Sequence, residues 1–267
     1  MNKGWGLAAL GAAVMLTGCV NSEERGLSLV VADTGKSDFI LIQAEGCTVV
    51  NDAAYLESYP EVSALMKSRG VSHIDLLILS HFDKDHIGGA ADILRDFEVE
   101  RVIMPDYFGG SEYWLELMDA LGESGAEQVA LSEDADFTLG EVSFHISAPK
   151  LAEYDDKNDH SLITEITFGE TRFLLTGDAR DARLGEFLAD SPAEHYDLIK
   201  MPHHGSYSKA LGQLVSDTAP DFAVITAAED RETVDKRTVK ALEGCETVFT
   251  DEGTAVFFSD GESVIRQ

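Results

Sequence analysis

The sequence predicts an α/β (α+β) protein with a four-layer αββα sandwich, in which two β-rich halves pack together with helices outside them. Three observations lead to this fold class. Strands and helices follow one another in a similar order twice along the 267 residues. No long linker or low-complexity tract separates the two sets. Residues 75–79 form a near-continuous apolar run, which is typical of a strand covered on both faces of its sheet.

The first half begins with apolar runs that predict three strands, the last two joined by the hairpin signal Glu45-Gly46. Pro60 opens a helix and Gly70 ends it. Further strands and helices then alternate as far as residue 146. The expected strands are 27–31, 39–42, 47–50, 75–79, 99–104, 128–131, 136–139 and 142–146, and the expected helices are 60–69, 87–94 and 112–121.

The second half starts after a polar break at 151–159. Its first two strands are joined by Gly169-Glu170, a second hairpin signal. The expected strands are 161–168, 171–176, 198–201, 222–226, 247–250, 255–258 and 264–266, and the expected helices are 184–189, 210–216 and 235–242. The strand ending at 176 leads directly to Asp178, and the strand ending at 201 leads to His203 and His204.

The first 18 residues are expected to be a targeting signal and not part of the fold. Lys3 supplies a positive start, and residues 7–16 are apolar but too few to span a membrane. The stretch ends in Leu-Thr-Gly-Cys, which resembles a bacterial lipobox and implies lipidation of Cys19. The expected organisation is a lipoprotein signal peptide at 1–18, a lipidated tether at 19–26 and one domain at 27–267.

Such a lipoprotein would belong to the bacterial cell envelope, held to a membrane by its lipid alone and facing the periplasm or the exterior. Val20 stands where an aspartate would retain the protein in the inner membrane, so in a Gram-negative cell the outer membrane is favoured. Cys47 and Cys245 could pair in an oxidising compartment or stay as buried free thiols.

The chain is strongly acidic, with 20 basic and 49 acidic residues and a net charge of −29. This charge favours solubility and repels polyanions over most of the surface. Long nucleic acids are normally bound by a basic stripe, and the sequence shows none. The expected partner is therefore a small molecule or a short oligonucleotide. Nothing in the sequence indicates an oligomeric state.

Residues 80–89 carry the chemistry, because four metal-ligand side chains fall within six positions: His81, Asp83, Asp85 and His86. Alternate residues leaving a strand point the same way, so the first two can converge on one cation. The other two, at the start of a helix, face a neighbouring point. Imidazole and carboxylate together suit zinc best here, with manganese or iron as alternatives. The stretch predicts one or two divalent metal ions.

At these residues the sequence resembles the metallo-β-lactamase superfamily, whose signature His-x-His-x-Asp-His it matches with Asp83 in place of the middle histidine. It is most similar to the extracytoplasmic hydrolase domain of bacterial competence proteins, which belong to DNA-uptake channels. The resemblance covers about residues 27–260 and implies the αββα fold and hydrolase activity. Further matching stretches are 33–42, 158–162 (Asn-Asp-His-Ser-Leu), 174–179 (Leu-Leu-Thr-Gly-Asp-Ala) and 202–206 (Pro-His-His-Gly-Ser).

The resemblance assigns metal ligands residue by residue. A first metal would be bound by His81, Asp83 and His160. A second would be bound by Asp85 and His86, with Asp178 bridging the two.

The resemblance also implies supporting roles. Asp33 and Asp52 would orient the ligating histidines from a second layer. His203 or His204 would supply a ligand, a general acid or an oxyanion contact, and we expect His203 to be the one that faces the metals. Asp85 would orient the nucleophile.

One departure concerns the second metal. The competence proteins usually have Gly-His-Pro after the strand that corresponds to 222–226, and that histidine closes the site. Here residues 229–235 read Glu-Asp-Arg-Glu-Thr-Val-Asp. Asp230 or Asp235 could substitute for the histidine, or the second site could be weak or empty.

The leading hypothesis is a metal-dependent hydrolase in which a metal-bound hydroxide attacks a phosphodiester or related ester bond, and a histidine protonates the leaving group. Two alternatives stay open. One is a non-catalytic or single-metal binding protein of the envelope on the same fold. The other is a lactonase or β-lactamase-like hydrolase, with residues 107–110 and Trp114 as walls of an apolar pocket.

Overall fold

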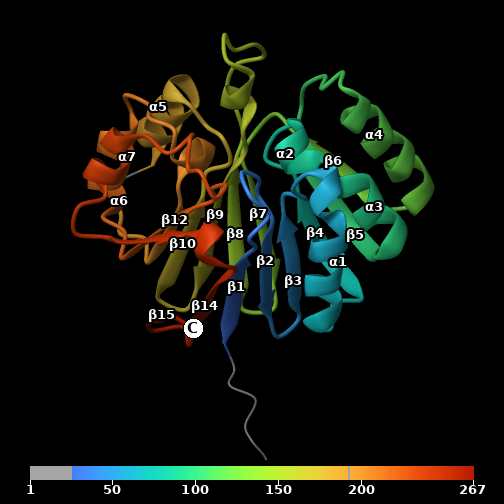
Figure 1. The fold of residues 1–267 in the computed structure, drawn as a ribbon. Coiled ribbons are helices and arrows are strands. Elements are labelled where there is room, and N and C mark those ends of the chain that lie inside the picture. Colours follow the sequence, from blue (N-terminus) through green and yellow to red (C-terminus); the bar gives the residue numbers. More distant parts are fainter. Residues whose placement is uncertain (1–25, 192) are drawn as a thin grey trace, which may run out of the picture.

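The computed structural model describes residues 26–191 and 193–267 as two β-sheets packed face to face, with helices on both outer sides (Figure 1). The expected αββα sandwich is thereby confirmed. The signal peptide at 1–18, Cys19 and most of the tether lie outside the described residues and stay predictions. Within the described ranges, no helix is both long enough and apolar enough to cross a membrane.

The first sheet has eight strands in the order β15-β14-β1-β2-β3-β4-β5-β6. Pairing is antiparallel from β15 to β3 and parallel from β3 to β6. The strands are β1 (Leu27–Val31), β2 (Ile40–Ala44), β3 (Cys47–Asn51), β4 (His73–Ile78), β5 (Glu98–Pro105), β6 (Glu127–Leu131), β14 (Ala255–Ser259) and β15 (Val264–Arg266).

The second sheet has seven strands in the order β13-β12-β11-β10-β9-β8-β7. Here β10 to β13 pair in parallel, and β7 to β10 pair antiparallel. The strands are β7 (Ala135–Leu139), β8 (Val142–Ser147), β9 (Ile163–Phe168), β10 (Thr171–Leu175), β11 (Leu198–Lys200), β12 (Phe222–Ile225) and β13 (Glu246–Phe249).

The helices divide between the two outer layers. Those of the first half are α1 (Tyr59–Ser68), α3 (Ala90–Asp96) and α4 (Glu112–Ser124), and those of the second are α5 (Asp181–Asp190), α6 (Leu211–Thr218) and α7 (Lys236–Ala241). Shorter turns are α2 (Lys84–Ile87) and the 3-10 segments η1 (Leu56–Ser58), η2 (Lys157–His160), η3 (Pro202–Gly205) and η4 (Thr250–Glu252). The expected helices agree with these bounds to within a few residues.

Strand β1 shows how the layers are made. Leu29 and Val31 are buried in the core between the sheets, whereas Val30 is buried under the helices of the first half. This follows from the two-residue period of a strand, because successive side chains point to opposite faces. A strand covered on both faces is apolar at every position, and burying each such side chain stabilises the fold by about 1.5–3 kcal/mol.

The last two strands depart from a simple division into halves, because β14 and β15 return to the first sheet. Strand β14 pairs antiparallel with β1, with Leu27 opposite Ser259 and Val31 opposite Ala255. The pairing covers the edge of β1, and Phe257 enters the core between the sheets. The end of the chain therefore ties the two halves together. Cys47 and Cys245 are both free thiols.

Candidate metal centre

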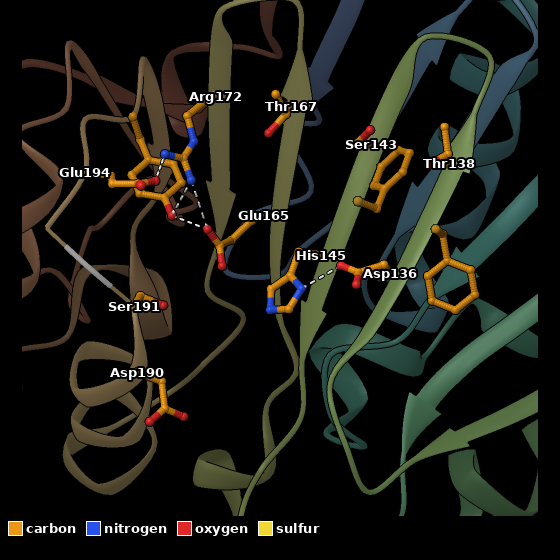
Figure 2. Close-up of a pocket in the computed structure, with 13 residues that line it drawn as sticks. Asp136, Thr138, Ser143, His145, Glu165, Thr167, Arg172, Asp190, Ser191 and Glu194 are labelled. Carbon is orange, nitrogen blue, oxygen red and sulfur yellow. Dashed lines mark hydrogen bonds and ion pairs between the residues drawn. The ribbon is translucent and has the colours of Figure 1, made fainter.

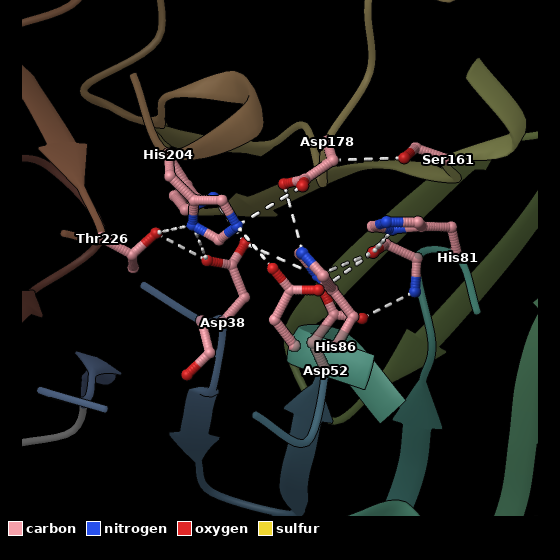
Figure 3. A network of polar contacts seen from close by, with 12 residues as sticks. Asp38, Asp52, His81, His86, Ser161, Asp178, His204 and Thr226 are labelled. Carbon is pink, nitrogen blue, oxygen red and sulfur yellow. Dashed lines mark hydrogen bonds and ion pairs between the residues drawn. The ribbon is translucent and has the colours of Figure 1, made fainter. Parts of the chain in front are cut away.

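The candidate centre lies where parallel strands of both sheets end (Figure 3). Asp52 follows β3, and His81 comes shortly after β4, in the first sheet. Asp178 comes shortly after β10, and His204 lies in η3 after β11, in the second sheet. Because the carboxyl ends of parallel strands lie at one edge of a sheet, these loops meet at one end of the sandwich.

The first half supplies its residues from one tight turn. Asp83 is the N-cap residue of α2, and the helix then carries Asp85 and His86. Gly88 and Gly89 allow this turn to pack against the backbone after β3. A Cβ on Gly88 would lie 2.4 Å from the Leu56 nitrogen, and one on Gly89 would lie 2.6 Å from the Ala53 oxygen. The glycine pair therefore holds the turn against the segment that carries Asp52.

The second half supplies its histidines from a left-handed turn. His203, His204 and Gly205 have φ angles of 47°, 52° and 79°. Such angles are costly for residues with a Cβ, and where they persist they mark functional sites more often than ordinary turns. The turn is fastened to β10 by the His203 backbone N–H, which donates to the Gly177 oxygen at 3.2 Å. It leaves His204 fully buried and His203 partly exposed.

Four side chains form the cluster: Asp85, His86, Asp178 and His204, each with one ligand atom within 4.8 Å of the others. The Nε2 atom of His86 is 3.2 Å from Oδ1 of Asp178. The Nε2 atom of His204 is 3.4 Å from Oδ2 of Asp178 and 3.5 Å from Oδ2 of Asp85. Two carboxylates and two imidazoles from different sheets thus surround one small volume.

His81 lies against this cluster, with its ring centroid 4.2 Å from that of His86. Its Nδ1 is 3.1 Å from the Ser80 hydroxyl, and its Nε2 is buried. The expected ligand His81 is therefore placed beside the cluster, on the side of the first sheet.

Asp52 orients His86, the cluster histidine of the first half. Its carboxylate accepts hydrogen bonds from the Ser80 backbone N–H at 2.7 Å and from the Ser80 hydroxyl at 2.8 Å. Its Oδ2 also lies 2.8 Å from Nδ1 of His86. The contact fixes the ring, as expected of a second-layer carboxylate.

Asp38 orients His204, the cluster histidine of the second half, and this role was not predicted from the sequence. Thr226 donates to Asp38 at 2.7 Å, and Nδ1 of His204 is 2.8 Å from the Thr226 oxygen and 3.5 Å from the Asp38 carboxylate. Asp33, expected in this role, is exposed and accepts instead from the Gly35 N–H at 3.4 Å. Both aspartates belong to one loop, and only the contact with the second sheet distinguishes them.

Lys200 supports Asp38 from behind. It lies on β11, is fully buried and forms an ion pair with Asp38. A charged residue inside the apolar run 198–201 was the sequence signal for it. Burial alone would raise the pKa of Asp38, but Lys200, with His204 and His86, lowers it. Asp52 has no such cation, and burial raises its pKa in spite of His86.

The charges of the cluster are mutually dependent. Burial would lower the pKa of His86, but Asp178 and Asp52 raise it well above its ordinary value. Burial acts in the same direction on His204, and the contacts with Asp178 and Asp85 again raise the pKa. Burial would raise the pKa of Asp178, yet the two histidines hold it well below its usual range. A divalent cation can take the place of the two imidazole protons, since metal binding deprotonates its ligands.

The orientation of the rings is the best test of whether a metal fits. Each of His81, His86 and His204 turns its Nδ1 back to a protein partner, and each has a buried Nε2 that makes no hydrogen bond. Oδ1 of Asp178 is also buried without a hydrogen-bond partner. Buried polar atoms are normally paired, so several converging exceptions need an explanation. Imidazole Nε2 and carboxylate oxygen are zinc-type ligands, and this set fits a divalent metal.

Two expected ligands lie outside the four-residue cluster. Asp83 forms an ion pair with Lys157, with 2.6 Å between Oδ1 and Nζ. His160 stacks on Tyr107 at a centroid distance of 4.0 Å and meets the edge of Tyr154 at 5.0 Å. The structure therefore brings together His81, Asp85, His86 and Asp178 of the six expected metal residues, with the addition of His204.

His203 differs from expectation, since its neighbour His204 and not His203 enters the cluster. Nε2 of His203 is 3.8 Å from Asp178, and Nδ1 is 2.6 Å from Nη1 of Arg180. A guanidinium group can only donate, so Nδ1 of His203 is the acceptor and the proton resides on Nε2. Burial lowers the pKa of this imidazole, and the charge of Arg180 adds to the effect. His203 therefore presents an N–H to the edge of the cluster.

The proposed substitutes for the late histidine do not reach the cluster. Asp230 accepts from the Glu232 N–H at 3.2 Å, and Asp235 caps α7 and pairs with Arg237. Neither is found among the described groups of converging ligand atoms. His204 stands instead beside Asp85, His86 and Asp178, and it can supply the ligand that the missing histidine would give.

Two of the cavities within the described residues have volumes of about 400 Å³ or more, and one of these two adjoins the cluster through Asp85. The larger, about 490 Å³, lies on the second sheet around His145 and Arg172 (Figure 2). Several of its charged groups are paired with one another, as in the 2.8 Å contact between His145 and Asp136 and the 3.3 Å contact between Arg172 and Glu165. The other, about 400 Å³, is lined by Asp83 and Asp85. The cavity beside the cluster is the better substrate site of the two, because Asp85 of the cluster lines it.

Comparison with known proteins agrees with the fold described above. The family model of the metallo-beta-lactamase superfamily matches residues 32–226. ComE operon protein 3 of Bacillus subtilis is 27% identical over 165 residues, which is 62% of this chain and 21% of that protein. Recombination protein 2 of Haemophilus influenzae is 27% identical over 203 residues, 76% of this chain and 23% of that protein. The chain thus spans about a fifth to a quarter of the length of these relatives.

Solved structures show the same fold at low sequence identity. The metallo-beta-lactamase fold protein YhfI from Bacillus subtilis superposes with a TM-score of 0.61 at 14% identity, covering 88% of this chain and 100% of that chain. A structure described as Tm1679, a metal-dependent hydrolase of the beta-lactamase superfamily, has a TM-score of 0.55 at 12% identity, covering 86% of this chain and 98% of that chain.

Proposed function

Since this chain belongs to the metallo-β-lactamase superfamily, we propose that it is a metal-dependent hydrolase that cleaves phosphodiester or related ester bonds at the cell envelope. The observation that carries the proposal is the convergence of Asp85, His86, Asp178 and His204, in which the buried Nε2 atoms of both histidines lie 3.2 and 3.4 Å from the Asp178 carboxylate without forming a hydrogen bond of normal geometry. The resemblance of the sequence motifs to the hydrolase domain of competence proteins favours the phosphodiester as the bond, and the lipobox-like sequence before Cys19 supports the envelope location.

A metal would be held by Asp85, His86, Asp178 and His204, with His81 next to them. When bound, it would polarise the scissile group and lower the pKa of water toward about 7. Zinc suits these ligands best, with manganese and iron as alternatives.

The protein groups then have separate tasks. Asp52 and Asp38 hold the rings of His86 and His204, so that both Nε2 atoms face the reacting group. Asp85 faces the substrate cavity and orients the attacking water. His203 presents its Nε2 proton at the cluster edge, where it can pass to the leaving oxygen.

The test is hydrolysis by the full-length protein after its metal content has been measured. The substrates are a chromogenic phosphodiester, single-stranded DNA and a lactone. We expect turnover of the phosphodiester and a loss of at least about 100-fold for Asp85→Asn, comparable to losses from single catalytic groups. Asp119→Asn makes the same change on the exposed side of α4 and is expected to keep full activity.

The departure at residues 229–235 gives the non-catalytic alternative its support, since the usual late histidine is missing there. Bound metal without turnover of any substrate would favour an envelope binding protein and refute the hydrolase. Turnover of the lactone alone would refute the phosphodiester. Unchanged activity of Asp85→Asn would refute the site assignment.

A further inference from the structure

The cavity beside the metal cluster has an unusual charge for this protein. Three of its nine lining residues are lysines: Lys36, Lys84 and Lys157. They come from three separate segments, namely the loop after β1, the start of α2 and the start of η2. The chain as a whole has 20 basic and 49 acidic residues. The fold has thus brought three lysines to the cavity that is lined by Asp85 of the cluster.

The other cavity provides the comparison. It is lined by Asp136, Glu165, Asp190 and Glu194, with Arg172 as its one Lys or Arg residue (Figure 2). Arg172 is already paired there with Glu165 at 3.3 Å and with Glu194. This cavity is acidic, like the chain as a whole. The cavity beside the cluster contains more basic than acidic residues and will be called the lysine cavity. With three lysines and two aspartates the lysine cavity has one net positive charge before a metal binds, and a positively charged cleft attracts ligands of the opposite sign.

Two of the three lysines form ion pairs with carboxylates of the cavity, and the third does not. Lys36 is 3.1 Å from Asp85, and Lys157 is 2.6 Å from Asp83. No ion pair joins Lys84 to a carboxylate within residues 26–191 and 193–267. Its ammonium lies 5.7 Å from the ring centroid of Tyr55 and the side chain is exposed. Once a divalent metal neutralises Asp85, the charge of Lys36 is also available to a ligand.

The remaining lining groups suit a polar anion. Burial and the nearby carboxylates, Asp85 foremost, raise the pKa of Tyr55 to about 12, so its phenol keeps its proton and can donate it in a hydrogen bond. Tyr113 and Ser111 add two more hydroxyl groups. A volume of about 400 Å³ holds a ligand of nucleotide size. A compact site of this kind is compatible with the net charge, which excludes only an extended polyanion.

We propose that Lys36, Lys84 and Lys157 bind a phosphate group of the substrate next to the bond that is cleaved. The natural substrate therefore carries a second phosphate beside the scissile one, in a short oligonucleotide or in a small phosphorylated molecule. This inference rests on the proposed function for the position of the cleaved bond, whereas binding of a phosphate at the lysines can be measured without any hydrolysis.

The test is calorimetric titration of the full-length protein with thymidine 5′-phosphate, which has no diester bond, and with thymidine as the uncharged control. The titrations are made with and without zinc. The wild type is expected to bind the phosphate and not thymidine. The triple variant Lys36→Gln, Lys84→Gln, Lys157→Gln is expected to bind it about tenfold or more weakly, the sum of three partly exposed charge contacts.

The matched control removes the same charge elsewhere. Lys67→Gln, Lys236→Gln, Lys240→Gln changes three exposed lysines of α1 and α7 and is expected to keep the wild-type affinity. Equal weakening in both triple variants, or equal binding of thymidine and its phosphate by the wild type, would overturn the proposal. Because Lys36 and Lys157 pair with carboxylates, the single variant Lys84→Gln serves as the folding-neutral check and is expected to lose a few-fold in affinity.

A second arm separates the two sources of the phosphate. Thymidine dinucleotides with and without a 5′-phosphate are compared with inorganic phosphate as competitors. Preference for the phosphorylated dinucleotide over inorganic phosphate points to an oligonucleotide end, and equal competition points to a small phosphorylated molecule. Phosphate binding together with failed hydrolysis would refute the proposed function and leave this site standing.

Discussion

The two histidine pairs reach one cluster on different backbones. His81 lies in the turn after β4 and His86 lies in the short helix α2, both in ordinary conformations. His203 and His204 are adjacent and both left-handed, with φ of 47° and 52°. In each pair one histidine is inner and one is outer. The inner histidines, His86 and His204, contact Asp178 through Nε2 at 3.2 and 3.4 Å.

The inner and outer histidines differ in the same way in both pairs. The pKa values of the inner ones are raised by carboxylates, foremost Asp178. The pKa values of the outer ones, His81 and His203, are lowered by burial, that of His81 to about 3. The two pairs have different backbones, yet each contains one histidine with a raised pKa and one with a lowered pKa. The contacts with carboxylates therefore decide which histidine of a pair has the raised pKa, and the spacing along the chain does not.

The two inner histidines differ in the surroundings of the aspartate that holds each ring. Asp52 contacts His86 and has no lysine partner, whereas Asp38, behind His204, is paired with the buried Lys200. Removing Lys200 would make the two pairs alike. We predict that Lys200→Met destabilises the protein by about 3–5 kcal/mol, because Asp38 is left as a buried carboxylate without its cation. Urea unfolding of wild type and variant measures the difference.

The double variant Lys200→Met, Asp38→Asn is the control for this prediction. It removes both charges of the pair, and buried ion pairs replaced as a unit cost little. We expect it to recover at least half of the lost stability. A single variant as stable as the wild type would show that Lys200 does not support the second pair.

The next effect concerns the metal. We predict that Asp52→Asn and Asp38→Asn each weaken zinc binding by about 10–100-fold, since second-layer carboxylates orient the ligating histidine and raise its basicity. Competition with a chromophoric chelator measures both affinities. If only Asp52→Asn weakened zinc binding, Asp38 would not support a metal ligand as Asp52 does. His204 would then not be a ligand.

The smallest predicted effect is on the pH dependence of stability of the chelator-treated protein. The outer histidines, with lowered pKa, are protonated more readily in the unfolded chain, so stability is lost as the pH falls below about 6.5. The inner histidines, with raised pKa, contribute stability that is complete below about 6.5 and is lost as the pH rises through their folded values. Stability should therefore be greatest near neutral pH and fall on each side by about 1 kcal/mol per pH unit.

Urea unfolding at pH 5, 7 and 9 measures this curve. The variant His81→Gln, His203→Gln removes both outer histidines and should flatten the acid side alone. A wild-type curve that rises steadily from pH 5 to pH 9 would contradict the assignment of the inner histidines.

The two pairs also differ in how far the sequence reveals them. The first pair was predicted because strand, turn and helix are consecutive, so its side-chain directions follow from local geometry. The four layers were predicted for a similar reason, from apolar runs of strand and helix period. The choice between His203 and His204 depends on a left-handed turn, and no rule of spacing predicts which ring turns inward.

The other unpredicted features depend on contacts between the sheets. Asp38 and Asp33 are equivalent as sequence, and only Asp38 meets Thr226 of the second half. His160 matches a ligand position by resemblance, but it stacks on Tyr107. The return of β14 to β1 likewise joins residues that are far apart in the chain. These pairings depend on long-range packing that a single sequence does not display.

His204 completes the metal cluster in place of the missing late histidine, and this role can be measured. Zinc content of the full-length protein, measured by elemental analysis after equilibrium dialysis, tests it most directly in His204→Gln and His203→Gln. We expect His204→Gln to lose one equivalent of zinc and His203→Gln to keep the wild-type content. Wild-type content in His204→Gln, or loss of zinc in His203→Gln alone, would contradict it.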